Sequence, residues 1–344
     1  MIKEAINRVV AGGSLDEEEA ERVMEDIMGG RASAAQIAAL LTALRLKGET
    51  VAEITGFARV MRRLATPVRC RFPVAVDTCG TGGDGAGTFN ISTAAALVIA
   101  GAGVPVAKHG NRSASSRCGS ADVLETLGVH LDLPAAALEG CLEEVGMAFL
   151  FAPALHKAMK HAAGPRREIG IRTVFNVLGP LTNPAGAGAQ VLGVYSPELV
   201  PRLARVLCRL GVRRAFVVHG AGGLDEVSPA GPAQVSEVDE GAVRDFTLDP
   251  AACGLPRAPV EALAGGGAEE NAAIIREILC GVTGPRRDAV LINAALGLVA
   301  AGAAADIPGG LALAAQSIDS GEAQAKLEAL IDYTRRAARQ VASL

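Results

Sequence analysis

The chain has 344 residues, of which 50% are hydrophobic, and a formal net charge of −4. A chain of this length and apolar content can bury a large core and is expected to form two domains. The acidic balance, the lack of any run of lysine and arginine, and an aromatic content of only 3% argue against a nucleic-acid-binding protein, which needs positive charge and stacking surfaces.

Seven cysteines are scattered along the chain without a C-x-x-C spacing. This pattern predicts neither a disulfide framework nor a zinc site, and it favours a reducing cytoplasm. The N-terminal segment MIKEAINRVV carries mixed charge and has no signal-peptide core. The most apolar stretch, Ala289–Ala305, is short for a membrane span and contains Asn293, so it is predicted to be a core helix. We therefore expect a soluble cytoplasmic protein.

The first 70 residues are predicted to form a small helical domain. Three S/T-x-x-E/Q capping boxes, which mark helix starts, begin at Ser14, Ser33 and Thr50. Glycines at 29, 30 and 48 supply the matching helix ends. The expected helices span residues 3–11, 16–28, 34–47 and 51–64.

After residue 71 the pattern changes to short β-branched runs that alternate with helical segments. This alternation predicts an α/β domain with a mainly parallel sheet and helices on both faces. The expected strands are Val74–Asp77, Val104–Lys108, Ala148–Phe151, Val191–Tyr195 and Ala215–His219. A helix is expected over Leu199–Leu210. Ligands of such sheets bind at the carboxyl ends of the strands.

The first expected strand leads into a dense cluster of glycines. From Val76 the sequence reads VDTCGTGGDGAGTFNIST, and an alanine-rich helix is expected to follow. Glycines let the backbone approach a ligand closely because they carry no Cβ. The helix N-terminus adds free N–H groups and a positive dipole end. We therefore expect this loop to bind an anion, most simply a phosphate group.

Other interpretations of the glycine loop are weaker. The stretch Gly80–Gly85 fits G-x-G-x-x-G, but that dinucleotide fingerprint requires an acidic residue about 20 positions further on. Here the next strand ends in the basic segment KHGNRS, which begins at Lys108. No G-x-x-x-x-G-K-[ST] sequence is present, which disfavours a P-loop ATPase. A turn without a ligand is disfavoured because a carboxylate and several hydroxyl and amide side chains accompany the five glycines.

Four sequence blocks follow the order in which one enzyme family has them. They read DTCGTGGDG-x-x-TFN-x-ST, KHGNRS-x-SS, GPRREIGIRTVFNVLGPLTNPA (Gly164–Ala185) and GLDEVSP (Gly223–Pro229). Together they closely resemble the anthranilate phosphoribosyltransferase family. The resemblance implies transfer of the 5-phosphoribosyl group from phosphoribosyl pyrophosphate (PRPP) to the amine of anthranilate, with release of pyrophosphate. This reaction is the second step of tryptophan biosynthesis from chorismate.

The resemblance also implies a fold shared with the pyrimidine nucleoside phosphorylases. The helical domain over residues 1–70 would be completed by helices from about 164–188, and the α/β domain would span 71–344. The substrates would bind between the domains with Mg²⁺ as cofactor. A homodimer would form through the helical domain, without nucleic-acid or membrane partners.

The resemblance assigns two groups of residues to PRPP. The first group follows the first strand and comprises Gly80, Gly82, Gly83, Asp84, Thr88, Asn90, Ile91, Ser92 and Thr93. The second group follows the second strand and comprises Lys108, His109, Gly110, Asn111, Arg112, Ser113, Ala114, Ser115, Ser116 and Ser120.

Several of these side chains also have a purely structural interpretation. Asp84 can form an Asx-turn, because its carboxylate would repel pyrophosphate unless a metal or a ribose hydroxyl intervenes. Ser92 can cap a helix, and Arg112 can belong to a structural ion pair. His109 is expected to position substrate and not to act as a base, because the amine of anthranilate is already neutral at pH 7. No general acid or base is therefore predicted.

The metal ligands implied by the resemblance are Ser92, Asp225 and Glu226. Magnesium in proteins prefers one or two carboxylates together with substrate oxygens and water. The anthranilate-binding residues implied are Gly80, Asn111 and Arg166. Arginine is a natural bidentate partner for the anthranilate carboxylate; Arg167 is the competing candidate.

The chain departs from the family pattern just before this arginine. His156 is retained, but Lys157 stands where a proline is common and Leu155 where a polar residue is common. This departure affects the entrance for anthranilate and not the phosphate site.

Two other functions are less consistent with these residues. Nucleoside phosphorolysis needs one inorganic phosphate and not a pyrophosphate with its metal, so Asp225, Glu226 and the KHGNRS segment count against it. A non-catalytic nucleic-acid-binding relative is disfavoured by the acidic balance and the intact glycine loop.

Overall fold

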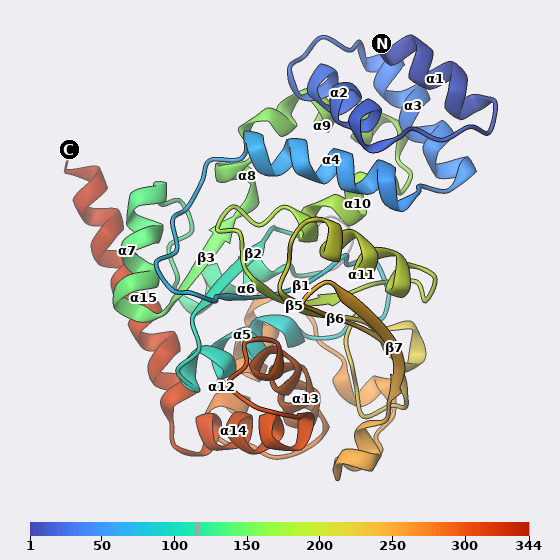
Figure 1. Cartoon of the computed structure of the whole chain (residues 1–344). Coiled ribbons are helices and arrows are strands. Elements are labelled where there is room, and N and C mark those ends of the chain that lie inside the picture. Colours follow the sequence, from blue (N-terminus) through green and yellow to red (C-terminus); the bar gives the residue numbers. More distant parts are fainter. Residues whose placement is uncertain (114–116, 344) are drawn as a thin grey trace.

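The computed structural model describes residues 1–113 and 117–343. Figure 1 shows a helical layer at the top, a sheet in the middle and a second group of helices below. The helical layer begins with four helices: α1 (Ile2–Val10), α2 (Glu17–Met28), α3 (Ala34–Lys47) and α4 (Val51–Leu64). The helices predicted for this region are confirmed to within one residue at each end.

Two of the three predicted capping boxes are confirmed, at Ser33 and at Thr50. The prediction at Ser14 is wrong, because α2 starts later and has Asp16 as its N-cap. The Asp16 carboxylate accepts a hydrogen bond from the backbone N–H of Glu19 (2.8 Å), whose own carboxylate accepts from the N–H of Asp16 (3.1 Å). Aspartate caps helices as well as serine does, and two cap-forming residues lie close together here.

In the described part of the chain the sheet has seven strands, in the order β3-β2-β1-β4-β5-β6-β7. Their bounds are β1 (Val76–Gly80), β2 (Val106–Gly110), β3 (Met147–Phe151), β4 (Ala189–Gly193), β5 (Arg214–His219), β6 (Ala233–Asp239) and β7 (Ala242–Leu248). The strands β1 to β5 pair in parallel, whereas β6 and β7 are antiparallel. The predicted fold class, helical plus α/β with a mainly parallel sheet, is confirmed.

The strand predictions differ from the structure in two ways. The strand β1 begins two and ends three residues later than expected, β2 lies two residues later, and β4 lies two residues earlier. The β6–β7 hairpin was not predicted. Its second strand, at the sheet edge, is exposed at Ala242, Arg244, Asp245 and Thr247, so its sequence lacks the apolar run that marks a central strand.

The remaining helices connect and cover the strands. They are α5 (Ile91–Gly101), α6 (Ser120–Leu127), α7 (Ala135–Val145), α8 (Ala152–Leu155), α9 (Lys160–Ile169), α10 (Phe175–Leu178), α11 (Leu199–Arg209), α12 (Ala268–Leu279), α13 (Pro285–Ala300), α14 (Ile307–Asp319) and α15 (Glu322–Ala342). Single 3₁₀ turns occur at Lys157–Met159, Gly179–Leu181, Ala221–Gly223, Pro250–Cys253 and Val260–Leu263.

Two hydrophobic clusters fill the two sides of the sheet. One contains α5 and the helices α12 to α15 below it. The other contains α1 to α4, α9, α10 and α11 above it. The helix α9 follows β3 in the chain yet packs on α2 and α3. The chain therefore returns to the helical layer after it has begun the sheet.

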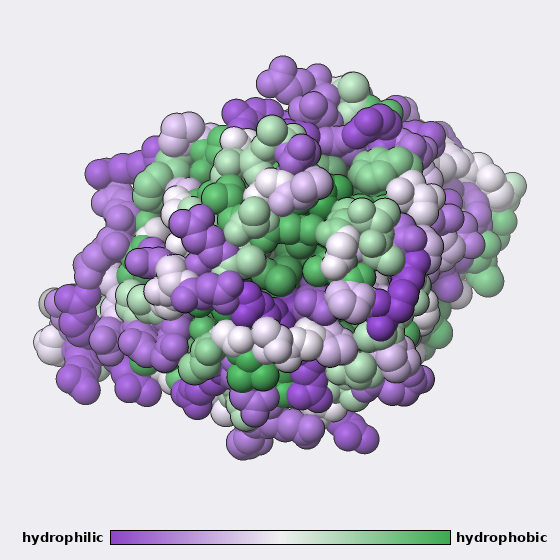
Figure 2. Space-filling view, turned by 90° about the horizontal axis from the view of Figure 1, so that it is seen from below, coloured by the Kyte–Doolittle hydropathy of each residue, from purple (hydrophilic) through white to green (hydrophobic). Residues whose placement is uncertain are grey.

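The helix α13 corresponds to the core helix that was predicted over Ala289–Ala305. Asn293 is buried within it, where its amide donates to the carbonyls of Val227 and Ala289. Figure 2 shows the lower face of the molecule, with apolar side chains at its centre and hydrophilic ones around them. Among residues 1–113 and 117–343, no helix is both long and apolar enough to cross a membrane.

Candidate active site

The predicted site residues converge at the carboxyl ends of β1, β2 and β5. The glycine loop continues directly from β1, and Asp225 follows β5 after a 3₁₀ turn. Lys108 and His109 were expected at the end of their strand but lie inside β2. Parallel strands end at a common edge, which brings these distant segments together.

The acidic turn after β5 packs directly against the glycine loop. The Asp225 carboxylate accepts a hydrogen bond from the backbone N–H of Gly82 (2.8 Å). A Cβ at Gly80 would lie 2.4 Å from the Oδ2 of Asp225, and one at Gly193 would lie 1.5 Å from the Asp225 carbonyl oxygen. Only glycine leaves room for this approach. The glycines at 80 and 193 thus fix the place of Asp225.

Three carboxylates form an acidic cluster beside this loop. One oxygen from each of Asp84, Asp225 and Glu226 lies within 4.8 Å of the others. Burial raises the pKa of Asp225, and the nearby Asp84 raises it further. Burial likewise raises the pKa of Glu226 well above its usual value, followed by repulsion from Asp225. The sequence pattern assigned Asp84 to PRPP only, so its place among the candidate metal ligands was missed.

The cluster has the features of a cation site. The Oε2 atom of Glu226 is buried without a hydrogen-bond partner among the described residues. A cavity of about 10 Å³, lined by Ser92, Asp225 and Glu226 among others, lies beside it, which is room for about one water-sized particle. Three carboxylate oxygens within 4.8 Å of one another, two of them from residues that line this space, match the oxygen ligands of Mg²⁺. Asp84 also forms the Asx-turn, since its Oδ1 accepts from the N–H of Ala86 (3.2 Å).

Lys108 is buried under the glycine loop with 1% of its surface exposed. Its ammonium group donates to the carbonyl of Thr78 and to the hydroxyl of Ser92 (3.5 Å). Burial lowers the pKa of Lys108, and the neighbouring acids Asp77 and Glu226 oppose this shift. Ser92 does not cap α5, because the N-cap is Asn90. Its hydroxyl is therefore left to face Lys108 and the small cavity.

The other residues of the first group hold the loop in place. The side chain of Asn90 donates to the carbonyl of Cys118 (3.2 Å) and accepts from Asn271 (2.9 Å). Thr88 forms an isolated bridge with Ala264. Ile91 and Thr93 are buried at the start of α5, and the Thr93 hydroxyl has no partner in the described part of the chain.

Two buried imidazoles lie on the opposite side of β2 from Lys108. The rings of His109 and His156 have centroids 5.1 Å apart, and the Nε2 of each is buried without a partner within the described residues. Burial lowers the pKa of His109 to about 3 and that of His156 to about 4, so both rings are neutral at pH 7. The sequence named His156 only as a retained residue near the anthranilate entrance.

The KHGNRS segment continues into an ion-pair network. Arg112 contacts Asp122 (3.0 Å) and Glu125 (2.7 Å), which is the structural role left open for it. The backbone N–H of Ser113 also donates to Asp122 (3.1 Å). Ser120 donates to the carbonyl of Asn111 (3.3 Å), and a Cβ at Gly110 would lie 2.4 Å from the hydroxyl of Ser120. The predicted residues Ala114, Ser115 and Ser116 lie outside the described residues.

Arg166 lies half-buried in α9, with its guanidinium 4.9 Å from the centroid of the Phe175 ring. In the described part of the chain it has no carboxylate within 4 Å, and burial lowers its pKa. Arg167 is exposed. A stacked, unpaired guanidinium is suited to an incoming carboxylate, which favours Arg166 over its neighbour.

Arg172 was not predicted as a site residue, although it lies in the same block as Arg166. Its guanidinium donates to the carbonyl of Gly83 and stacks on the Tyr195 ring at 4.6 Å. It therefore links the segment before α10 to the glycine loop. The only sequence signal for Arg172 was its position in the block Gly164–Ala185, because its partners Gly83 and Tyr195 are both distant from it in the sequence.

Comparisons with known proteins identify the family of the chain. Residues 73–324 match the α/β domain of a glycosyl transferase family, and residues 3–65 match its helical bundle domain. The chain is 70% identical to an anthranilate phosphoribosyltransferase of Pelotomaculum thermopropionicum, with 97% of each chain covered. It is 64% identical to one of Moorella thermoacetica, covering 97% of this chain and 98% of the relative.

Solved structures extend the likeness to three dimensions. The anthranilate phosphoribosyltransferase of Thermus thermophilus superposes with a TM-score of 0.92 at 50% identity, covering 96% of this chain and 99% of that one. The enzyme of Saccharomyces cerevisiae in complex with PRPP and Mg superposes with a TM-score of 0.89 at 31% identity, covering 97% and 98%.

Proposed function

The chain belongs to the glycosyl transferase family and, within it, to the anthranilate phosphoribosyltransferases, and we propose that its glycine loop and acidic cluster form the site of their reaction. It transfers the 5-phosphoribosyl group of PRPP to the amine of anthranilate in tryptophan biosynthesis. The observation that carries the assignment of the site is the buried acidic cluster next to an N–H-rich loop.

The chemistry needs a group that stabilises the departing pyrophosphate. When the C1–O bond of PRPP breaks, positive charge develops on the ribose and negative charge on the pyrophosphate. Asp84, Asp225 and Glu226 would hold Mg²⁺, which neutralises the leaving group when bound. The loop around Gly83 offers N–H groups and the N-terminus of α5, and Lys108 adds positive charge beneath it.

Anthranilate would bind on the side of the helical layer. Arg166 would take its carboxylate, while Gly80 and Asn111 would line the position of its amine. The amine attacks as a neutral nucleophile, so no base has to remove a proton first. His109 and His156 fit this, because neutral buried imidazoles add no positive charge beside the developing cation.

We infer a homodimer through the helical layer, and two domains, 1–70 with about 164–188 and 71–344. The packing of α9 on α2 and α3 supports the discontinuous helical domain. Val10 and Leu46, at the ends of α1 and α3, are 69% and 83% exposed and are available for a partner chain. Within the described residues, Cys70, Cys79, Cys141, Cys208, Cys253 and Cys280 form no disulfide, which supports a cytoplasmic location.

The proposed site is tested by replacing its acids. Asp225→Asn and Glu226→Gln should each raise the magnesium concentration needed for half-maximal activity at least tenfold, because each removes a charged ligand. Activity is followed as the loss of anthranilate fluorescence in the presence of PRPP. Glu240→Gln, at an exposed turn, is the matched control and should leave the magnesium titration unchanged. An unchanged titration in both site variants would show that these acids do not bind the metal.

A further inference from the structure

A second cavity lies between the helical layer and the sheet, apart from the acidic cluster. Its volume is about 280 Å³. Its walls come from the end of α3, the start of α4, the segment before α10 and the turn between β4 and α11. None of its lining residues was predicted to bind PRPP, anthranilate or metal.

The lining of this cavity has an excess of positive charge. Arg45, Arg172 and Arg202 face two acids, Glu49 and Glu198. Within the described residues, none of the three arginines has a carboxylate within 4 Å. Burial raises the pKa of Glu49, which weakens its negative charge, although Arg45 and Arg202 oppose this shift. A guanidinium without a carboxylate partner is free to bind an anion.

The same cavity has an apolar side. Ile54, Val174 and Leu199 are buried residues that line it, together with the half-buried ring of Tyr195. Pockets with apolar walls and a few convergent charged groups are typical of small-molecule sites. A crevice between domains that binds no ligand would not need these apolar lining residues.

Two residues of the cavity also touch the glycine loop. The guanidinium of Arg172 donates to the carbonyl of Gly83. The backbone N–H of Tyr195 donates to the hydroxyl of Thr81 (3.1 Å). A ligand that attracts Arg172 would therefore compete with the carbonyl of Gly83 for this guanidinium.

We propose that this cavity binds a small carboxylic acid with an apolar body. Its carboxylate pairs with Arg45 and Arg202, and its apolar part lies on Ile54, Val174 and Leu199. The same carboxylate also attracts Arg172, which lines the cavity, away from the Gly83 carbonyl, and its binding so changes the affinity of the glycine loop for its own ligand. Only this last step rests on the proposed binding of PRPP by the loop.

The chain carries its own reporter for this site. It has no tryptophan and two tyrosines, Tyr195 in the cavity and Tyr333 in α15. In a Tyr333→Phe variant, tyrosine emission comes from Tyr195 alone. Phenylacetate and L-phenylalanine are the probes, because they absorb weakly where tyrosine is excited. Benzylamine, which lacks the carboxylate, is the negative control.

Phenylacetate or L-phenylalanine should change the emission of Tyr195 saturably, and benzylamine should not. A response to both acids identifies a general carboxylate site, and a response to L-phenylalanine alone identifies an amino-acid site. Arg202→Gln and Arg45→Gln should each weaken binding about tenfold or more. Arg166→Ala should leave it unchanged, which separates this cavity from the anthranilate position. Matched circular dichroism spectra show that each variant is folded.

The absence of a saturable change, an equal response to benzylamine, or unchanged binding in both arginine variants would overturn the proposal. The coupling is read separately from the PRPP concentration at half-maximal rate, which the bound acid should shift at least about threefold. An unshifted value would overturn the coupling. The fluorescence titration needs neither PRPP nor turnover. A protein that is inactive with PRPP and anthranilate, in the absence of phenylacetate and L-phenylalanine, would therefore count against the proposed function and not against this cavity.

Discussion

Neighbouring residues of the site differ in chemistry because β2 sends them to opposite faces. Lys108 points toward α5, where it meets Ser92, and His109 points toward the helical layer, where it meets His156. Successive side chains of a strand alternate in this way. One short segment therefore places an ammonium group on one face of the sheet and a neutral ring on the other.

Replacing Arg166 by alanine should raise the KM for anthranilate far more than the KM for PRPP. A hydrogen bond to a charged group contributes about 1.5–3 kcal/mol, so the KM for anthranilate should rise roughly tenfold or more. Steady-state kinetics with each substrate varied in turn measure both constants. Arg167→Ala is the control, because that neighbour is exposed. Equal effects of Arg166→Ala on both substrates would remove its assigned role.

The buried ring of His156 should make the protein less stable as the pH falls below about 6.5. Its folded pKa is lowered to about 4, so the unfolded chain, with a histidine pKa of about 6.5, takes up the proton first. This contribution is complete above the unfolded pKa and disappears toward pH 4. Between pH 7 and pH 5 the wild-type chain should lose about 2 kcal/mol more unfolding free energy than His156→Gln.

Urea unfolding at the two pH values measures this difference. Two other groups in this part of the protein also titrate. They are His109 and Asp77, and burial raises the pKa of Asp77 to about 6. The comparison with the single variant removes the contribution of Asp77, which both chains share, and leaves that of His156 with its effect on His109. His130→Gln, at an exposed position, should keep the wild-type slope, and a slope that stays equal in His156→Gln would contradict the prediction.

At the scale of elements, one buried carboxylate joins two helices of the helical layer, α3 and α4, to the loop before α2. Glu53, in the first turn of α4, accepts from the N–H of Leu15 (3.0 Å) and of Thr50 (2.8 Å). It also pairs with Lys47 at the end of α3 at 2.9 Å, with side-chain exposures of 0% and 11%. Glu53 therefore both completes the capping box of α4 and binds the loop before α2.

Replacing Glu53 by glutamine should lower the free energy of unfolding by about 3 kcal/mol, because it leaves the charge of Lys47 without its buried partner. Denaturant titration measures the change. Glu18→Gln is the matched control in α2, where the side chain is 87% exposed. It should change stability by less than about 0.5 kcal/mol. Equal stability of the two variants would show that the buried pair contributes little.

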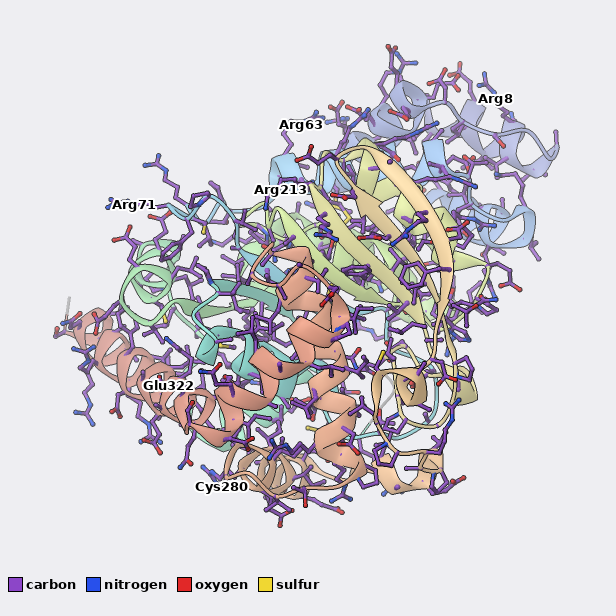
Figure 3. The ribbon with its side chains drawn as sticks, turned by 60° about the horizontal axis from the view of Figure 1, so that its bottom comes forward. Arg8, Arg63, Arg71, Arg213, Cys280 and Glu322 are labelled. Atoms are coloured by element: carbon purple, nitrogen blue, oxygen red, sulfur yellow. The ribbon has the colours of Figure 1, made fainter. Side chains whose placement is uncertain are left out.

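At the scale of the whole molecule, the helical layer and the group of helices below the sheet form opposite ends. The helical layer, which carries Arg8 and Arg63, stands at the end opposite Cys280 (Figure 3). Leu46 is 83% exposed at the end of α3. Such an exposed leucine gains about 2 kcal/mol when a partner chain buries it. This end is therefore where we expect the dimer contact.

Leu46→Glu should shift the protein from dimer to monomer, because it removes this apolar burial and brings like charges together. Size-exclusion chromatography with light scattering measures the mass across a dilution series. Val282→Glu is the control; Val282 is 53% exposed and lies two residues after Cys280 at the other end. A dimer that persists equally in both variants would place the contact elsewhere.

Local patterns predicted the elements well where one kind of signal was strong. The boxes at Ser33 and Thr50 marked the starts of α3 and α4, and Gly48 marked the end of α3. The bounds of β1 and β2 were less exact, because an apolar run that is buried on both faces does not show where pairing begins. The β6–β7 hairpin was missed since edge strands need few apolar residues.

The sequence by itself determined the glycine loop, the helical layer and the family, because these depend on residues that are close together in the chain. Only the tertiary structure decided which distant groups meet. The Asp225 carboxylate reaches the N–H of Gly82 across 143 positions, Asp84 joins the acidic cluster, and Arg172 reaches Gly83. Such contacts depend on the order of parallel strands and the packing of the layers, and no local spacing records either of them.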